Sequence, residues 1–263
     1  PMNFAAGEIA HAFVEARQSW KSVSTYPGNP PADLATAYRI QDEALSIWKR
    51  RIGGWKVGKI NPPASEALGA NRLIGPVFED AIQFEKGDGN VFRIFDRGFA
   101  AVEAEFMLRL APTGGALPRN RQEAMDWVDD VRIGIEVASS PYARINLDGP
   151  CVTVSDHGNN AGLLIGKRID REHWPMLDEV EVSLDIDGKE AGRATTATML
   201  DGPFGAVTFL IQNLAERQIE PRAGWWISSG AITGVHEIAP GGVAAAHFEN
   251  IGSITARVDA DPT

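Results

Sequence analysis

The acidic residues of two segments could together bind a metal ion. In the segment Ala101–Phe106, Glu103 and Glu105 alternate with apolar residues. Successive side chains of a strand point to opposite faces, so both carboxylates would lie on one face, roughly 6.5–7 Å apart at their Cα atoms. Two like charges on one face repel each other unless a cation lies between them. Glu136 is a single carboxylate in the otherwise apolar segment Ile133–Ala138, where burying it unpaired would be unfavourable.

Two interpretations of these three glutamates stay open at this point. Alternating glutamates are common on the solvated outer face of a sheet, and the pattern alone favours that interpretation. Against it, the small residues Gly134 and Ala138 flank Glu136 on its own face and leave room around the carboxylate, as in a pocket. Three carboxylates without a nearby histidine or cysteine would suit a hard cation, Mg²⁺ or Mn²⁺, with water or substrate oxygens in its remaining positions.

Lys56 is the candidate for proton transfer. In the segment Gly54–Gly58 it shares one face with the two glycines, while Trp55 and Val57 lie on the other face. A lysine with such small neighbours can reach into a cavity, where it would hold a carboxylate or relay a proton beside a metal-bound acid. The alternative is a surface lysine whose aliphatic stem covers apolar groups, and the pattern alone favours it.

Two polar turns could provide hydrogen bonds to a ligand. Ser155–Gly162 is a dense polar loop before an apolar strand, and it fits an Asx-type turn equally well. Ser228–Ala231 follows an apolar run but lacks the spacing of a nucleophile elbow, and His157 alone supports no catalytic triad. The glycines near Pro240 do not follow the strand–loop–helix pattern of a phosphate site. These observations exclude serine hydrolase, nucleotide-binding and zinc sites.

Helical elements are expected first at the N-terminus. Apolar residues at helical spacing predict one helix around Ile9–Ala16 and a second over about Ala32–Arg51. Pro31 suits a first-turn position of the second helix, and Gly53-Gly54 would end it. Two later helices are predicted, over about Arg121–Asp130 and Gly205–Arg217.

The rest of the chain has the pattern of β structure. Asp187-Gly188 between two alternating segments predicts a hairpin. Strands outnumber helices after residue 54 without regular β–α alternation, which predicts an α+β protein with a curled sheet or sandwich body. We expect a helical segment over residues 1–53 and a β-rich catalytic domain over residues 54–263, joined in one continuous unit. The predicted strands are Gly54–Ile60, Phe99–Ala111, Val131–Ser139, Gly162–Ile169, Val180–Ile186 and Gly252–Val258.

The composition limits the partners and the cellular compartment. The chain has 263 residues, of which 44% are hydrophobic, so it can bury a sizeable core. A formal net charge of −10 argues against nucleic acid and anionic membrane as partners. Cys151 is the single cysteine, which fits a cytoplasmic protein without an internal disulfide. We find no apolar run of membrane-spanning length and no signal peptide.

Four motifs in this order resemble the 2-oxopent-4-enoate hydratases and 4-oxalocrotonate decarboxylases, a branch of the fumarylacetoacetate hydrolase superfamily. The resemblance runs over nearly the whole chain, and the ordered set is more specific for the superfamily than for the reaction. The motifs are Gly54–Gly58, Val102–Phe106, Glu136-Val137 with Ser155–Asn159, and Ser229–Ala231.

The resemblance implies a metal site formed by Glu103, Glu105 and Glu136, with Lys56 as the functional lysine. It also implies a β-sandwich or β-roll body of the fumarylacetoacetate hydrolase C-terminal type after N-terminal helices, a small 2-oxo acid substrate and a homo-oligomer. The residues placed at substrate-contacting positions are Asp156, Asn159 and Ser229.

The chain departs from the family pattern at three places. Lys59-Ile60-Asn61 stands where the family often has a hydroxyl residue, and His157 where it often has asparagine. Many members carry an acid just before the glycine that matches Gly75, whereas this chain has Arg72-Leu73-Ile74 there. Arg72 could grip a second carboxylate or another substituent of the substrate. These departures leave the substrate and the reaction open.

The hypothesis we favour is a hydratase of aromatic-compound catabolism. It would add water to an unsaturated acid such as 2-hydroxypenta-2,4-dienoate through a metal-stabilised enolate. A 2-oxo acid decarboxylase of the 4-oxalocrotonate type is the alternative. An acylpyruvase-like C–C hydrolase is disfavoured because no histidine lies between His11 and His157. A non-enzymatic binding protein with solvated glutamates is the fourth hypothesis.

Overall fold

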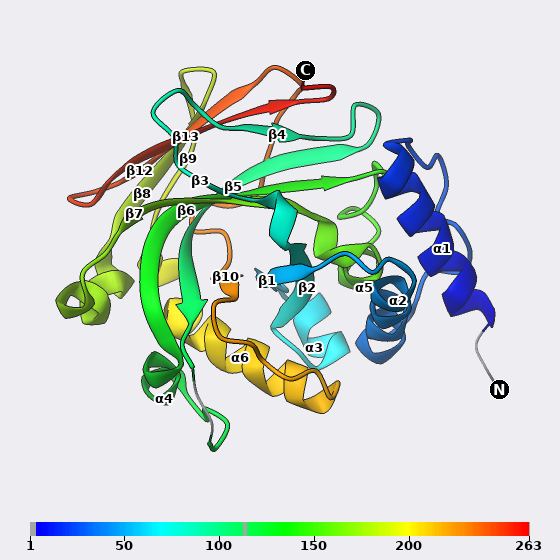
Figure 1. The fold of residues 1–263 in the computed structure, drawn as a ribbon, viewed down its shortest axis with the longest axis horizontal. Helices are drawn as coiled ribbons and strands as arrows, with labels where there is room; N and C mark the ends of the chain where they lie inside the picture. Colours follow the sequence, from blue (N-terminus) through cyan, green and yellow to red (C-terminus); the bar gives the residue numbers. More distant parts are fainter. Residues whose placement is uncertain (1–3, 113–114, 263) are drawn as a thin grey trace.

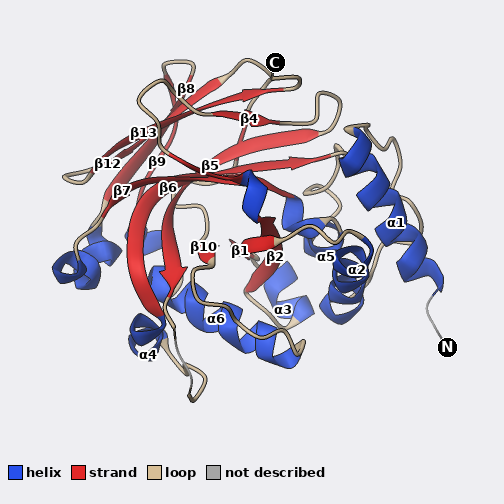
Figure 2. Ribbon diagram, viewed as in Figure 1, coloured by secondary structure: helices blue, strands red, loops and turns tan. Residues whose placement is uncertain are grey.

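A computed structural model describes residues 4–112 and 115–262, which form two β-sheets with helices around them (Figure 2). The larger, eight-stranded sheet has the order β2-β1-β10-β5-β6-β7-β3, and β11 pairs with β5 outside this order. Its strands are β1 (Ile52–Lys59), β2 (Arg72–Phe78), β3 (Ile82–Phe84), β5 (Phe99–Leu110), β6 (Val128–Ser140), β7 (Asn160–Arg168), β10 (Trp226–Ser228) and β11 (His236–Glu237).

The smaller sheet lies against the long strands of the larger one (Figure 1). It has five strands in the order β4-β13-β12-β8-β9. The ring of Phe106 on β5 lies 5.6 Å from the ring of Phe248 in this sheet, centroid to centroid, within the main hydrophobic core. The strands are β4 (Val91–Arg93), β8 (Glu181–Ile186), β9 (Lys189–Thr195), β12 (Val243–Phe248) and β13 (Gly252–Asp259).

Two N-terminal helices pack beside the larger sheet, as predicted. They are α1 (Phe4–Ser19) and α2 (Leu34–Ile47), and a second apolar cluster joins them to β5 and β6. The Asp33 side chain caps α2 by accepting a hydrogen bond from the Thr36 amide at 2.7 Å. The predicted first-turn role of Pro31 is therefore wrong, since the capping aspartate starts the helix later. Gly53 and Gly54 do not end α2 either, because they already lie in β1.

The helix α6 (Gly202–Glu216) covers the side of the larger sheet away from the smaller one (Figure 1). This agrees with the helix predicted over 205–217. Three short helices complete the set: α3 (Ala64–Leu68), α4 (Arg121–Ala124) and α5 (Pro150–Ser155). Among the described helices, none is long and apolar enough to cross a membrane.

The helix predicted over 121–130 is largely wrong. Only α4 and a 3₁₀ turn over Met125–Trp127 form, and β6 begins at Val128. The strand prevails because Val128 and the residues after it pair with Leu110 and the rest of β5. The hairpin at Asp187-Gly188 is confirmed between β8 and β9, and both turn residues have positive φ. The predicted α+β architecture with curled sheets is confirmed, while the boundary at residue 53 stays a prediction.

Candidate metal centre

Antiparallel pairing of β5 with β6 brings the three glutamates together. Glu103 pairs directly with Glu136, and Glu105 pairs with Gly134 one step along the same face. One carboxylate oxygen from each glutamate lies within 4.8 Å of those of the other two. Glu103 is 6% exposed, and Glu105 and Glu136 are fully buried. The interpretation of solvated glutamates on an outer face is therefore wrong.

The space that sequence analysis expected beside Glu136 is filled. A side chain at Gly134 would place its Cβ 2.5 Å from the Met107 side chain and from the Leu164 carbonyl oxygen. Ala138 lies in the apolar cluster under α1. These two small residues make room for neighbouring protein atoms, and the carboxylates gather through strand pairing instead.

Lys56 is the cation of this cluster. It is 4% exposed, and its Nζ lies 3.1 Å from Glu136 Oε1 and 3.3 Å from the side-chain oxygen of Asn159. The parallel pairing of β1 with β10 fixes its position, since Lys56 lies in register with Ser228. A Cβ at Gly54 would lie 1.9 Å from the Trp226 carbonyl oxygen, so that glycine permits the close approach of β10. The surface-lysine alternative is therefore wrong.

Ser228, Gly230 and Asn160 orient the glutamates. The Ser228 hydroxyl donates to Glu105 Oε2 in a short hydrogen bond, and the Gly230 amide donates to the same oxygen at 2.9 Å. Gly230 has φ +112°, a backbone conformation that favours glycine. The Asn160 amide donates to Glu136 Oε2 at 2.7 Å. In the sequence, these three residues were placed only within two polar turns, Ser228 and Gly230 in Ser228–Ala231, without individual roles.

The charges in this buried cluster do not balance, because three carboxylates face one ammonium group. Burial and the Glu136 carboxylate raise the pKa of Glu103 to about 8, against the opposing effect of Lys56. Burial and both neighbouring glutamates likewise hold the pKa of Glu105 well above its usual value. Burial would lower the pKa of Lys56, but the surrounding carboxylates outweigh it and raise that pKa. Without a cation, Glu103 and Glu105 would therefore hold protons at neutral pH, and a bound divalent cation would displace those protons.

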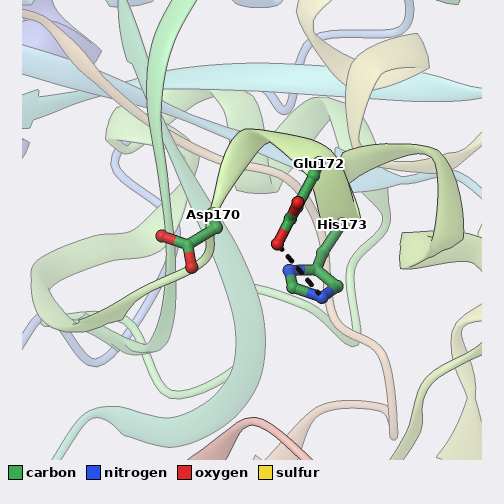
Figure 3. A group of neighbouring side chains, drawn as sticks. All are labelled: Asp170, Glu172 and His173. Carbon is green, nitrogen blue, oxygen red and sulfur yellow. Dashed lines mark ion pairs between the residues drawn. The ribbon is translucent and has the colours of Figure 1, made fainter.

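Two oxygen atoms of the cluster fit a metal ion. Glu105 Oε1 and Glu136 Oε1 are buried and accept no hydrogen bond from any residue within 4–112 and 115–262, where Glu136 Oε1 has only the ion pair with Lys56. An all-oxygen donor set suits a hard divalent cation. A second group of candidate ligands, Asp170, Glu172 and His173, is drawn in Figure 3; all three residues are exposed, and exposed acidic groups commonly bind no ion.

Two of the predicted substrate residues lie at this cluster. Asn159 contacts Lys56 through its oxygen and donates to the Asn146 side chain at 2.9 Å. Ser229 follows Ser228 on the same strand end, but its hydroxyl donates to the Phe106 carbonyl oxygen at 3.0 Å. A one-residue shift along a strand reverses the face, so Ser228 and not Ser229 reaches a glutamate.

Asp156 is engaged elsewhere. Its carboxylate accepts hydrogen bonds from Arg17 of α1 at 2.6 and 2.9 Å and from the Ser140 hydroxyl at 2.6 Å. Although burial opposes it, Arg17 and His157 hold the pKa of Asp156 well below its usual value. His157 Nδ1 lies 3.1 Å from Asp156, and burial lowers the pKa of this histidine. This buried pair ties α1 to the segment that carries Asn159.

Arg72 also lies outside the group that contacts the glutamates. Its guanidinium pairs with Asp201 at 2.6 Å, just before α6, and is buried. On β2, Leu73 and Gly75 pair with Gly58 and Lys56, so Leu73 shares the face of Lys56 and Arg72 lies on the opposite face. A substrate contact by Arg72 therefore stays a prediction.

Comparison with known proteins finds relatives along nearly the whole chain, although no family model matches. The 2-keto-4-pentenoate hydratase of Paraburkholderia xenovorans (strain LB400) is 24% identical over 259 residues, covering 97% of this chain and 95% of the relative. The 4-oxalocrotonate decarboxylase of Pseudomonas putida is 27% identical over 256 residues, covering 96% and 94%.

Solved structures share the fold. The 4-oxalocrotonate decarboxylase from Pseudomonas putida G7, complexed with magnesium and adipate, has a TM-score of 0.80 at 21% identity and covers 98% of each chain. The fumarylpyruvate hydrolase from Pseudomonas aeruginosa, in complex with Mn²⁺ and pyruvate, has a TM-score of 0.59 at 15% identity and covers 81% of this chain and 91% of that one. This chain therefore has the fumarylacetoacetate hydrolase fold and is similar, over nearly its whole length, to the 2-keto-4-pentenoate hydratases and 4-oxalocrotonate decarboxylases.

Proposed function

We propose that this protein is a divalent-metal-dependent hydratase that adds water to a small unsaturated acid such as 2-hydroxypenta-2,4-dienoate. The product would be 4-hydroxy-2-oxopentanoate. The observation that carries this proposal is the buried group of Glu103, Glu105 and Glu136, with one lysine in contact and two carboxylate oxygens that accept no hydrogen bond from a described residue. Relatives named 2-keto-4-pentenoate hydratase cover nearly the whole chain and support the reaction class.

The three glutamates would hold Mg²⁺ or Mn²⁺. A divalent cation at this place would supply positive charge for the carboxylate and 2-oxo oxygen of the substrate and stabilise the negative charge that develops there. Ser228 and Gly230 keep Glu105 in one orientation, and Asn160 does the same for Glu136. Such hydrogen bonds behind the ligands reduce the reorganisation that binding requires.

Lys56 would hold or move a proton at the substrate. The ammonium group of Lys56 has three N–H donors, and its contacts with Glu136 and Asn159 use two of them. One donor remains for the substrate. Asn159 fixes the end of the lysine chain, and Asn146 fixes Asn159 in turn. This chain of contacts holds the ammonium group beside the carboxylates, within reach of an acid bound there.

The wall beside Lys56 favours a substrate with an uncharged far end. A Cβ built on Gly58 would lie 3.4 Å from the Leu73 side chain and 3.6 Å from the Lys56 side chain. The apolar side chain of Leu73 therefore adjoins Lys56. The nearby arginines Arg17 and Arg72 are engaged by Asp156 and Asp201. A dicarboxylate such as 4-oxalocrotonate would need a second cation, whereas 2-hydroxypenta-2,4-dienoate carries one carboxylate.

A decarboxylase is the second candidate, supported by relatives named 4-oxalocrotonate decarboxylase at up to 27% identity. The same metal site could serve either reaction, so the substrates must separate them. We also propose a cytoplasmic homo-oligomer acting in aromatic-compound catabolism, with support from the single cysteine and from the family resemblance.

Turnover of both substrates tests the proposal. Purified protein with Mg²⁺ or Mn²⁺ should consume 2-hydroxypenta-2,4-dienoate, seen as loss of the dienol absorbance, and form 4-hydroxy-2-oxopentanoate. Chelation of the metal or Glu136→Gln should abolish this activity. Release of CO₂ from 4-oxalocrotonate without hydration of the dienoate would instead identify a decarboxylase. Hydration that persists in Glu136→Gln would contradict the assigned metal site.

A further inference from the structure

A cavity lies beside the metal centre without including its glutamates. It has a volume of about 870 Å³ and opens between the ends of α1 and α2, the strands β3 and β4, and the start of β7. None of the three glutamates lines it. Asn160 forms part of its wall and also donates to Glu136, so one side chain separates the cavity from the metal centre. The size is in the range of small-molecule binding pockets.

The lining of this cavity is cationic although the chain as a whole is acidic. Arg17, Lys49, Arg50 and Arg93 line it, and Asp80 is the one carboxylate among the described lining residues. Arg17 is neutralised by Asp156 and Arg50 by Asp80. Lys49 and Arg93 form no ion pair with a described residue; Arg93 donates only through Nε, to the Ala260 carbonyl oxygen. Their surplus charge would attract an anion against the net charge of −10.

Aromatic rings also line the cavity and pack against its arginines. The Arg93 guanidinium lies 4.4 Å from the ring centroid of Trp20, which packs against Phe95 at 4.6 Å. Arg50 lies over Trp48 at 4.9 Å and over Phe78 at 4.4 Å. Trp20 is 36% exposed and has φ +55°, an unusual backbone conformation for a large side chain. Its indole lines the cavity and stays partly exposed instead of entering the core.

We propose that this cavity binds a planar organic carboxylate. The ring of the ligand would pack against the indoles of Trp20 and Trp48, and its carboxylate would pair with Arg93 and Lys49. A guanidinium held against a ring has fewer conformations to lose when it binds a carboxylate. The combination of aromatic walls with two cations that have no carboxylate partner among the described residues selects for a flat anion over a neutral ring or a saturated acid.

Calorimetric titration with 2-naphthoate tests this proposal in metal-free protein, so that the glutamate cluster cannot bind the probe through a metal. We expect one binding site per chain. Cyclohexanecarboxylate, which has the charge without the flat ring, and 2-naphthol, which has the rings without the charge, should each bind about tenfold or more weakly. No binding of 2-naphthoate, or equal binding of all three compounds, would overturn the proposal.

Variants locate the bound probe. Arg93→Ala should weaken 2-naphthoate binding about tenfold or more, and Lys49→Ala, at an exposed position, should weaken it without risk to folding. Arg171→Ala is the matched control, since Arg171 lies 4.5 Å from the Trp174 ring in the same stacked arrangement elsewhere. Glu105→Gln, in the metal centre and without a hydrogen bond to any described cavity residue, should leave binding unchanged, which separates this site from the proposed function. Binding lost in Glu105→Gln, or retained in both cavity variants, would overturn the proposal.

The alternative occupant of this cavity is a second copy of the chain, and sedimentation velocity tests for it. The assembly state should be the same for wild type and Arg93→Ala. If Arg93→Ala dissociates an assembly and 2-naphthoate does not bind wild type, the cavity is part of a subunit interface and the proposed ligand site is wrong.

Discussion

Lys56 contacts Glu136, a carboxylate that the metal would also bind. Substitution of Lys56 can therefore separate its role in proton transfer from its effect on metal binding. Lys56→Met should lower turnover by about 10²–10⁴-fold, the usual contribution of a positioned proton donor or acceptor. Mn²⁺ binding should persist, because the substitution removes a cation that competes for Glu136. Turnover assays and calorimetry measure both effects. Lys59→Met, on the same strand but exposed, is the control, and an equally small effect of both variants would argue against the assigned role.

The two adjacent serines at the end of β10 give a matched pair. Ser228→Ala removes a donor to Glu105 and should weaken Mn²⁺ binding by about 10–100-fold. Ser229→Ala removes a bond to a backbone carbonyl and should leave Mn²⁺ affinity within a few-fold of wild type. Mn²⁺ titration of both variants measures this difference. The reverse order of effects would show that Ser229 supports the metal site.

For individual residues, the sequence predicted which residues belong to the site better than it predicted which residues they contact. Alternation correctly placed Glu103 and Glu105 on one face of a strand. The pairing of Glu103 with Glu136 could not be derived, because it depends on the register of two strands. Asp156 shows the same limit, since its partner Arg17 is 139 positions away along the chain.

One buried ion pair, between Arg17 and Asp156, adds to the apolar attachment of α1. Arg17→Met would leave the Asp156 carboxylate buried without its cation, which should lower the free energy of unfolding at pH 7 by about 3–5 kcal/mol. Urea denaturation measures the change. Arg144→Met, which breaks the partly exposed pair with Asp148, should cost less than about 1 kcal/mol. Similar losses for both variants would contradict the anchoring role of Arg17.

The pH dependence of that loss has a definite sign. In wild type the pKa of Asp156 lies below the unfolded value of about 3.9, so its stabilising contribution is present above that pH and is lost as the pH falls through the lower folded pKa. In Arg17→Met the buried carboxylate takes up a proton more readily. The difference in stability between the two proteins should therefore shrink as the pH falls from 7 to 4. A difference that grows would contradict this account.

Among elements, most of the long strands and helices were predicted, but β2 and β12, with seven and six residues, and the shortest strands were not. The strands β3, β4, β10 and β11 have two or three residues each, too few for a period to show. The helix predicted over 121–130 was overridden by pairing of its second half with β5, a tertiary contact that local propensity does not contain.

The molecule as a whole should gain stability from the metal. A ligand that binds only the folded state at 100 times its Kd adds about 2.7 kcal/mol to the free energy of unfolding. For a chain of this size we expect Mn²⁺ to raise the melting temperature by roughly 5 °C or more. Glu103→Gln should melt at least as high as wild type without metal, because one carboxylate is removed from a crowded buried cluster, and should lose the response to Mn²⁺. Thermal scans at several Mn²⁺ concentrations measure both, and an unchanged response would contradict the role of Glu103.

The central claim is that Glu103, Glu105 and Glu136 bind one divalent cation. Calorimetric titration with Mn²⁺ tests it most directly, in wild type, Glu136→Gln and Glu172→Gln, the last in the exposed cluster of Figure 3. We predict one Mn²⁺ per chain for wild type and Glu172→Gln, and a loss of about 100-fold or more in affinity for Glu136→Gln. Wild-type affinity in Glu136→Gln, or its loss in Glu172→Gln, would contradict the claim.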